Sequence, residues 1–265
     1  MLKKRLIFTL LYNDGQFMLS RNFRLQKVGD LHWLQENYDF AKIAFSIDEL
    51  VVLDVTRGQR DPKRFNDALA KISERCFLPI AAGGGVRDIA AARELLCSGA
   101  DKIVVNSIMS EKPECVALLA KEFGQQCVVA SVDVKRGIND DTRALTRCGT
   151  ETVHVSAKEY LSIVAELPVG EIYLNSIDRD GTGQGLELEL LDILPPSIRQ
   201  PVILAGGIGN ASHMATGLAD PRVDAVATAH LFNFVGDGLI RARQTLLQEG
   251  FNLASWDLAV LAELR

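Results

Sequence analysis

The feature that most constrains the fold is a series of eight short apolar runs, spread over nearly the whole 265-residue chain. They are rich in β-branched residues without strict polar alternation, which is typical of strands buried on both faces. Helical patterns lie between many of them, as at Asp88–Ser98, Pro113–Phe123 and Leu186–Ile193. Eight β–α units in a row predict an α/β fold, a closed parallel (βα)8 barrel, with a doubly wound open sheet as the rival. The runs are Arg5–Leu11, Glu49–Val55, Pro79–Ala82, Lys102–Asn106, Val128–Val134, Glu171–Ile177, Val202–Ala205 and Ala225–Ala229.

An internal repeat favours the barrel. The segment IAAGGGVRDIAAARELLCSGADKIVVNS from Ile80 aligns without a gap with ILAGGIGNASHMATGLADPRVDAVATAH from Ile203, a shift of 123 positions. Two similar halves fit a barrel with a two-fold axis, whereas an open sheet gives no such equivalence. We therefore predict one domain over residues 1–265, with half-barrels at about 1–125 and 126–250. In the tail 251–265, Trp256 and its apolar neighbours are expected to form a last short helix.

Composition narrows the class of protein. A net charge of −5 argues against a nucleic-acid or anionic-membrane surface, because both require basic patches. The five cysteines form no C-x-x-C pair and the four histidines are scattered, so we expect reduced thiols, no metal and no cofactor. The apolar run Leu6 to Leu11 is too short for a signal peptide, and no run reaches the ~20 residues of a membrane span. These features predict a cytoplasmic protein.

Glycine turns follow two of the predicted strands, at Gly83–Gly85 and at Gly206–Gly207. Glycine lets the backbone approach an anion closely, and successive N–H groups form a concave anion site. Each turn has a partner one strand later, at Asn106–Ser107 and Ala229–His230. In a barrel, all four lie at the C-terminal mouth, where active sites are built. The pattern predicts two phosphate sites on opposite sides of one mouth, with plain tight turns as the alternative.

Carboxylates also occur at predicted strand ends. Asp133 ends the run VVASV, and a carboxylate at that end of a barrel strand points into the mouth and can move protons. Asp54 ends another strand. Asp178 and Asp180 follow a third, beside Gly181, where a capping or loop-closing role is an equally good interpretation.

Four charges begin predicted strands: Arg5, Glu49, Lys102 and Glu171. If they point inward, two basic and two acidic groups form a paired ring across the bottom of the barrel, since buried charges must be paired. From periodicity alone, ordinary surface charges are the simpler interpretation.

The motifs DELVVLD, AAGGGVRD, GADKIVVNS, VDVKRG, EIYLNSIDRDGTGQG and ILAGGIG together resemble the cyclase subunit of imidazole glycerol phosphate synthase, from histidine biosynthesis. The resemblance runs from about Lys3 to Phe234. The sister isomerase of the pathway lacks SIDRDGT combined with both glycine turns. The resemblance implies a (βα)8 barrel that binds a bis-phosphorylated substrate across its mouth, with phosphate contacts at Gly84, Gly85, Asn106, Ser107, Gly181, Thr182, Gly206, Gly207, Ala229 and His230.

The resemblance also implies a partner. In the family, a glutaminase docks under the barrel as a heterodimer, and its ammonia travels through the barrel axis. Asp101 matches a family residue at the partner interface. Two aspartates at the mouth act as general acid and base while ammonia attack, cleavage and ring closure give imidazole glycerol phosphate and an aminoimidazole carboxamide ribotide. Asp133 matches one of the two. The four residues that match the family's charged gate are Arg5, Glu49, Lys102 and Glu171.

The first strand departs from the family pattern. Where the family has an aspartate in C-L-D-V, this chain has Leu11 in TLLY. Leucine cannot transfer a proton, and a general acid–base group typically contributes ~10²–10⁴-fold. Leu19 stands where a lysine is usual, and His230 where a serine is usual.

Paralogues with leucine at this position resemble the chain, including its Val28–Asp30 segment. They are encoded with surface-polysaccharide genes and are thought to deliver ammonia to a sugar-modifying amidotransferase. The favoured hypothesis is therefore an ammonia-delivering barrel for nucleotide-sugar or lipopolysaccharide amidation. The alternatives are an authentic histidine-pathway cyclase with an altered acid–base arrangement, and a non-catalytic scaffold that binds a phosphorylated ligand and activates the glutaminase.

Overall fold

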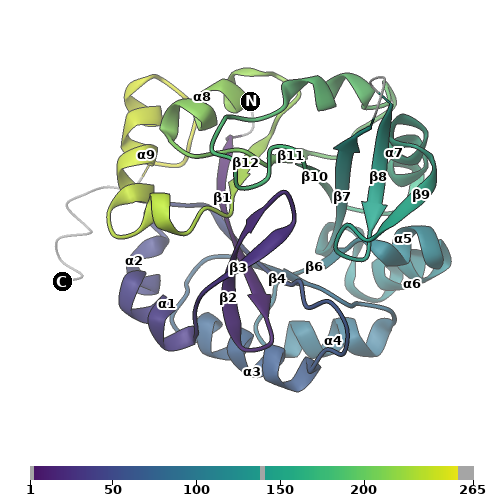
Figure 1. Ribbon diagram of the computed structural model, residues 1–265, viewed down its shortest axis with the longest axis horizontal. Helices are drawn as coiled ribbons and strands as arrows, with labels where there is room; N and C mark the ends of the chain where they lie inside the picture. The colour runs from purple at the N-terminus through teal and green to yellow at the C-terminus, as the bar shows by residue number, and fades with distance from the viewer. Residues whose placement is uncertain (1–2, 138–140, 256–265) are drawn as a thin grey trace.

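The computed structural model describes residues 3–137 and 141–255, and in these residues eight parallel strands close into a barrel (Figure 1). Closure follows from two pairings, β1 with β12 and β7 with β10. This confirms the predicted barrel and excludes the open sheet. The barrel strands are β1 (Arg5–Asn13), β4 (Glu49–Asp54), β5 (Ile80–Gly83), β6 (Lys102–Val105), β7 (Val128–Arg136), β10 (Glu171–Ser176), β11 (Val202–Ala205) and β12 (Ala225–Thr228).

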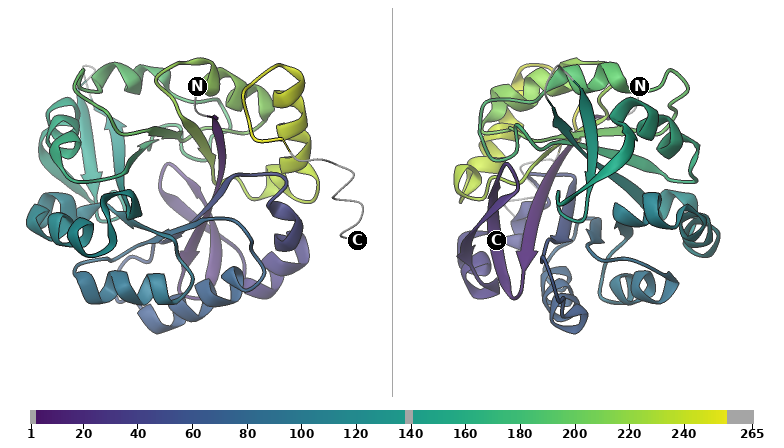
Figure 2. Two further views of the ribbon diagram at one scale, coloured as in Figure 1. Left: turned by 180° about the vertical axis from the view of Figure 1, so that it is seen from behind. Right: turned by 45° about the vertical axis from the view of Figure 1, so that its right-hand side comes forward.

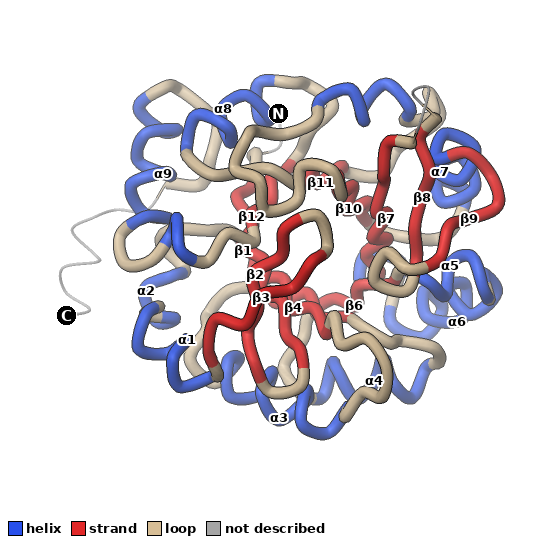
Figure 3. The backbone as a smooth tube through the Cα atoms, in the orientation of Figure 1, coloured by secondary structure: helices blue, strands red, loops and turns tan. Residues whose placement is uncertain are grey.

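Helices form an outer layer around these strands (Figures 2 and 3). Asp61, Asp88, Ser156 and Asn210 cap four of them, each accepting a hydrogen bond from the backbone N–H three residues later. No helix in the described ranges is long and apolar enough to cross a membrane. The α-helices are α1 (Leu31–Asn37), α2 (Phe40–Ile43), α3 (Pro62–Ser73), α4 (Ile89–Cys97), α5 (Ser107–Glu111), α6 (Pro113–Phe123), α7 (Ala157–Glu166), α8 (Ala211–Ala219) and α9 (Gly238–Gln248). The 3-10 helices are η1 (Gln125–Cys127), η3 (Leu188–Ile193) and η4 (Phe232–Phe234).

Two apolar cores hold the molecule together. The larger lies between the barrel and its helices. The smaller fills the interior of the barrel, where side chains from the strands meet along the axis. Its members are Ile7, Val51, Ala81, Val104, Val129, Tyr173, Ile203, Ala205, Ala225 and Ala227.

Two hairpins extend the barrel at its mouth: β2 (Gln16–Arg21) with β3 (Arg24–Gly29), and β8 (Thr142–Thr146) with β9 (Glu151–Ser156). They form because β1 and β7 are nine residues long and their ends pair antiparallel with β2 and β8. The eight apolar runs do not predict them. The Asp14–Gly15 dipeptide is a sequence signal for the antiparallel turn between β1 and β2, since both residues take the positive φ of a tight hairpin turn.

The barrel strands agree with the predicted runs to within two residues at each end. The helical pattern at Leu186–Ile193 corresponds to a 3-10 helix, η3 (Leu188–Ile193), and not to an α-helix. Pro195 and Pro196 follow directly and cannot continue a helix. Trp256 lies outside the described residues.

The half-barrel division stays a proposal, and the arrangement of the strands supports it. Each half begins with a nine-residue strand followed by a hairpin. Arg5 and Val128 begin these strands, 123 positions apart, the same shift as in the sequence repeat.

Candidate functional site

A cavity of about 520 Å³ lies at the mouth, and seven of the eight barrel strands contribute to its lining. Next to β5, the lining is formed by Gly84 and Gly85 of the turn that follows this strand. The lining brings together most of the residues predicted for the mouth: Leu11, Gly84, Gly85, Asn106, Ser107, Asp133, Gly181, Gly206, Gly207, Ala229 and His230. Thr182 is not among them. Its hydroxyl donates to the Arg179 carbonyl at 2.8 Å and accepts from the Gln184 N–H at 3.3 Å, so it stabilises its own loop.

Both glycine turns have a backbone that requires glycine. Gly84 has φ +111° and Gly207 has φ +101°. A Cβ at Gly84 would lie 2.2 Å from the Asp54 carbonyl oxygen, and a Cβ at Gly207 would lie 2.1 Å from that of Gly185. The two turns thus share one geometry on the two sides of the mouth, in which the main chain itself faces the cavity.

Asp133, near the end of β7, is held by two amides. Asn106 Nδ2 donates to Asp133 Oδ2 at 3.0 Å, and Asn175 Nδ2 donates to Asp133 Oδ1 at 2.9 Å. Burial raises the pKa of Asp133 to about 6, against the opposing effect of the Asn175 bond, and the nearby charge of Asp180 raises it further. Asp133 is therefore poised to exchange a proton near neutral pH.

The side of the cavity around Leu11 is apolar. Leu11, Leu19, Leu25 and Leu53 all line the cavity, and Leu11 is 9% exposed. The β1 position that carries an aspartate in the family is thus filled by hydrocarbon.

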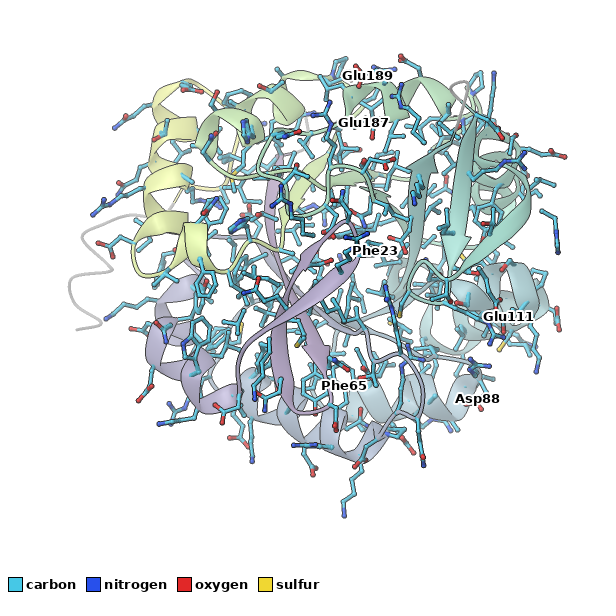
Figure 4. The ribbon with its side chains drawn as sticks, viewed as in Figure 1. Phe23, Phe65, Asp88, Glu111, Glu187 and Glu189 are labelled. Carbon is cyan, nitrogen blue, oxygen red and sulfur yellow. The ribbon has the colours of Figure 1, made fainter. Side chains whose placement is uncertain are left out.

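Asp180 is engaged by the β2–β3 hairpin. Asp180 Oδ2 accepts from the Ser20 hydroxyl and, at 3.0 Å, from the Phe23 N–H. Asn22 Nδ2 donates to the carbonyl oxygens of Ile177 and Asp178 at 3.1 and 2.7 Å. The hairpin tip therefore docks on the loop after β10 and lies across the mouth, where Figure 4 labels Phe23. Of the two roles considered for Asp180, the structure shows loop closure.

The four strand-start charges form one network at the opposite end of the barrel. Arg5 Nη1 lies 2.9 Å from both Glu49 Oε2 and Glu171 Oε1. Lys102 Nζ lies 2.8 Å from Glu49 Oε2 and 3.1 Å from Glu171 Oε2. Burial raises the pKa of Glu49, while Lys102 opposes this effect. The simpler interpretation of ordinary surface charges is thus wrong, because these residues pair across the barrel.

Asp101 lies at the same end as this ring, directly before Lys102. Its Oδ2 accepts from the Ile80 N–H at 2.8 Å, and the residue is exposed. Its position suits a partner contact, and it also fixes the start of β5.

Some residues of the cavity are not predictable from motifs. The hydroxyls of Thr9 and Tyr173 share a hydrogen bond of 3.0 Å, and both residues line the cavity. The loop after β4 adds Arg57 and Arg60 to the lining. Asn175 reaches Asp133 because the two are register partners in the β7–β10 pairing. The sequence signal for Asn175 is its place two residues after Tyr173, on the same face of β10.

His230 lies in the turn after β12, and its side chain is partly buried. Burial lowers its pKa, and Nδ1 accepts from the Asn233 N–H at 3.3 Å. The opposite ring nitrogen is left as the possible donor. In the described residues, no group of three or more His, Cys, Asp or Glu could hold a metal ion.

Comparison with known proteins agrees with this geometry. Residues 25–236 match the family model described as histidine biosynthesis protein. Over 259 residues, the chain is 44% identical to a protein of Parasynechococcus marenigrum (strain WH8102) described as "Putative imidazole glycerol phosphate synthase subunit hisF2". The match covers 97% of this chain and 96% of that relative. The chain therefore belongs to the histidine biosynthesis protein family, and within it to the cyclase-subunit family of imidazole glycerol phosphate synthase.

Proposed function

We propose that this barrel receives ammonia from a glutaminase docked under Asp101 and the charged ring, and conducts it along its axis to the mouth. The acceptor chemistry has diverged towards nucleotide-sugar or lipopolysaccharide amidation in the cytoplasm. The observation that carries the proposal is the combination of a fully paired ring at the bottom with Leu11 at the mouth.

The charged ring suits a gate for a neutral molecule. Lys102 and Arg5 each bridge both glutamates, so movement of one basic side chain opens the ring while the other keeps the glutamates paired. Above the ring, the interior is lined by apolar side chains. Transfer of the charged ammonium ion from water into such apolar surroundings is strongly unfavourable, whereas transfer of neutral ammonia is not.

The mouth suits a ligand that carries two phosphate groups. The two glycine turns present backbone from opposite halves of the barrel, and Asp133 lies between them as a group that titrates near neutral pH. With Leu11 in place of a second carboxylate, binding and ammonia delivery are retained, while paired acid–base chemistry is reduced.

One alternative is an authentic cyclase that makes imidazole glycerol phosphate and aminoimidazole carboxamide ribotide. It is favoured by Asp180, whose charge acts on Asp133 and whose own pKa is raised by burial, so it could replace the missing acid. Against it, the hairpin already occupies Asp180 Oδ2. The other alternative is a scaffold that binds a phosphorylated ligand and activates the glutaminase without chemistry of its own.

The test is a channelling experiment with barrel, glutaminase and the nucleotide-sugar amidotransferase. The system is given amide-¹⁵N glutamine and an excess of unlabelled ammonium. The amidated product should retain ¹⁵N with the wild-type barrel and lose most of it with Lys102→Ala. In the variant, the opened ring lets labelled ammonia from glutamine mix with unlabelled ammonia from solution. Amidation driven by saturating ammonium should survive in Lys102→Ala, which shows that the variant folds.

The matched control is Arg93→Gln, which removes an exposed cation paired with Glu122 on the outer helices. It should leave the ¹⁵N content unchanged. An unlabelled product with wild-type barrel, or equal labelling with Lys102→Ala, would show that ammonia does not travel through this axis.

A further inference from the structure

The two glycine turns differ in the charged side chains that accompany them. Four arginines line the mouth cavity: Arg57, Arg60, Arg87 and Arg147. Arg60 packs on Gly85, Arg87 follows that turn by two residues, and Arg147 donates its backbone N–H to the Ser107 hydroxyl at 3.0 Å. All three therefore neighbour the Gly84–Ser107 side.

The Gly206–His230 side has a different character. His230 is its basic residue in the cavity lining, and burial keeps its pKa low. The Arg179 Cβ packs against Gly207, but Arg179 does not line the cavity. This side therefore offers a ligand mainly backbone N–H groups.

Two of the four arginines, Arg57 and Arg147, are held by hydrogen bonds, and Arg87 is paired more loosely. Arg87 and Arg147 pair with Glu111 at 3.9 and 2.9 Å. Arg57 donates to the carbonyl oxygens of Phe23 and Cys148 at 2.7 and 3.0 Å, so it ties the two hairpins together over the mouth.

Arg60 is less exposed than Arg87, with 24% against 58% of its side chain accessible, and it pairs with Asp54 inside the cavity. Its Nε lies 3.4 Å from Asp54 Oδ2, is buried and makes no hydrogen bond with the described residues. Its Nη2 makes a long contact of 3.6 Å to the Cys148 sulfur. A Cβ placed at Gly85 would lie 3.1 Å from Arg60 Cδ and 3.2 Å from Nη1. The guanidinium therefore lies beside the glycine turn, and within residues 3–137 and 141–255 its Nη1 makes no hydrogen bond that would compete with a ligand.

We propose that Arg60 binds a phosphate oxyanion at the Gly84–Ser107 turn and makes this side the anchoring end of the mouth. The inference rests on the proposed phosphate-binding mouth. It adds that the Gly84–Ser107 side holds a phosphate group more tightly than the Gly206–His230 side does. A guanidinium can donate two parallel hydrogen bonds to phosphate, which the backbone turn complements from below. The ligand class is a molecule whose anchored end is a phosphate ester or a diphosphate, and whose other end is held mainly by backbone N–H groups.

The experiment titrates the full-length barrel with inorganic phosphate and, separately, with pyrophosphate. Binding is followed by calorimetry and by the amide NMR signals of Gly84, Gly85, Gly206 and Gly207. In the wild type, the Gly84 and Gly85 signals should shift at lower ligand concentration than the other two. Arg60→Gln should weaken that first event about 10- to 100-fold, the worth of a charge-assisted hydrogen bond. Arg60→Lys keeps the positive charge but loses the two parallel N–H donors of the guanidinium, so it should weaken this first binding event less than Arg60→Gln does.

Arg93→Gln is the control for loss of one positive charge and should bind as the wild type does. If pyrophosphate binds more tightly than phosphate and Arg60→Gln removes this preference, the anchored end of the ligand is a diphosphate. If both ions bind equally and Arg60→Gln weakens both to the same extent, the anchored end is a phosphate ester. Wild-type affinity in Arg60→Gln, or simultaneous shifts at both turns, overturns the role of Arg60 and leaves the mouth intact as a phosphate site. Absence of binding in the wild type contradicts the phosphate-binding mouth itself.

Discussion

At the scale of single residues, Asp133 is the group on which the proposed chemistry of the mouth depends. Its two oxygens are held by neutral amides, and burial raises its pKa because the hydrogen bonds from Asn175 and Asn106 offset burial only in part. The sequence motifs predict Asp133 as a functional carboxylate. They also show that leucine, at Leu11, stands where the resemblance predicts an aspartate. They do not predict the roles of Asn106 and Asn175, because these depend on which strands become neighbours when the barrel closes.

The raised pKa of Asp133 predicts a stability cost that depends on pH. A carboxyl group with a pKa of about 6 in the folded state and about 3.9 unfolded favours the folded state fully below pH 4. That benefit is lost as the pH rises through 6. The stability of Asp133→Asn relative to wild type should therefore grow by about 1–3 kcal/mol between pH 4.5 and 7.5, as measured by urea unfolding.

Asp237→Asn is a suitable control, because Asp237 is exposed and pairs with Arg241 at 3.7 Å. Its stability relative to wild type should vary little over the same range. A pH-independent difference for Asp133→Asn would show that the carboxylate is not strained by burial.

At the scale of elements, the β2–β3 hairpin lies across the mouth and lines part of its cavity. Its tip depends on Asp180, which accepts from Ser20 and from the Phe23 N–H. The Asp14–Gly15 turn makes the return of the chain from β1 into β2 predictable from the sequence. The docking of the hairpin is not, because Ser20 and Asp180 are 160 residues apart and meet only in the folded barrel.

Asp180→Ala should release this hairpin while the barrel stays folded. Loss of buried hydrogen bonds to a carboxylate costs about 1–3 kcal/mol, so amides of residues 17–29 should exchange with solvent about 10- to 100-fold faster. Hydrogen exchange followed by mass spectrometry measures this, and the amides of α6 serve as the internal control. Unchanged exchange in the hairpin, or equal acceleration in α6, would contradict a local role for Asp180.

At the scale of the whole molecule, the two ends of the barrel match the family resemblance to different degrees. The bottom has four paired charges, and the mouth has both glycine turns but Leu11 where the resemblance predicts a carboxylate on β1. The barrel itself follows from the eight runs and the repeat. The ring does not follow from periodicity, because strand-start charges become partners only when closure brings β1, β4, β6 and β10 around one axis.

The central claim is that ammonia delivery is retained while cyclase chemistry is reduced. The most direct measurement supplies the purified barrel with ammonium salt and the bis-phosphorylated substrate of the histidine pathway, and follows formation of imidazole glycerol phosphate. Since one acid–base group contributes ~10²–10⁴-fold, turnover should lie that far below that of cyclases with an aspartate at this position, and Leu11→Asp should raise it. Turnover equal to that of such cyclases, unchanged by Leu11→Asp, would contradict the account and identify the protein as an authentic cyclase.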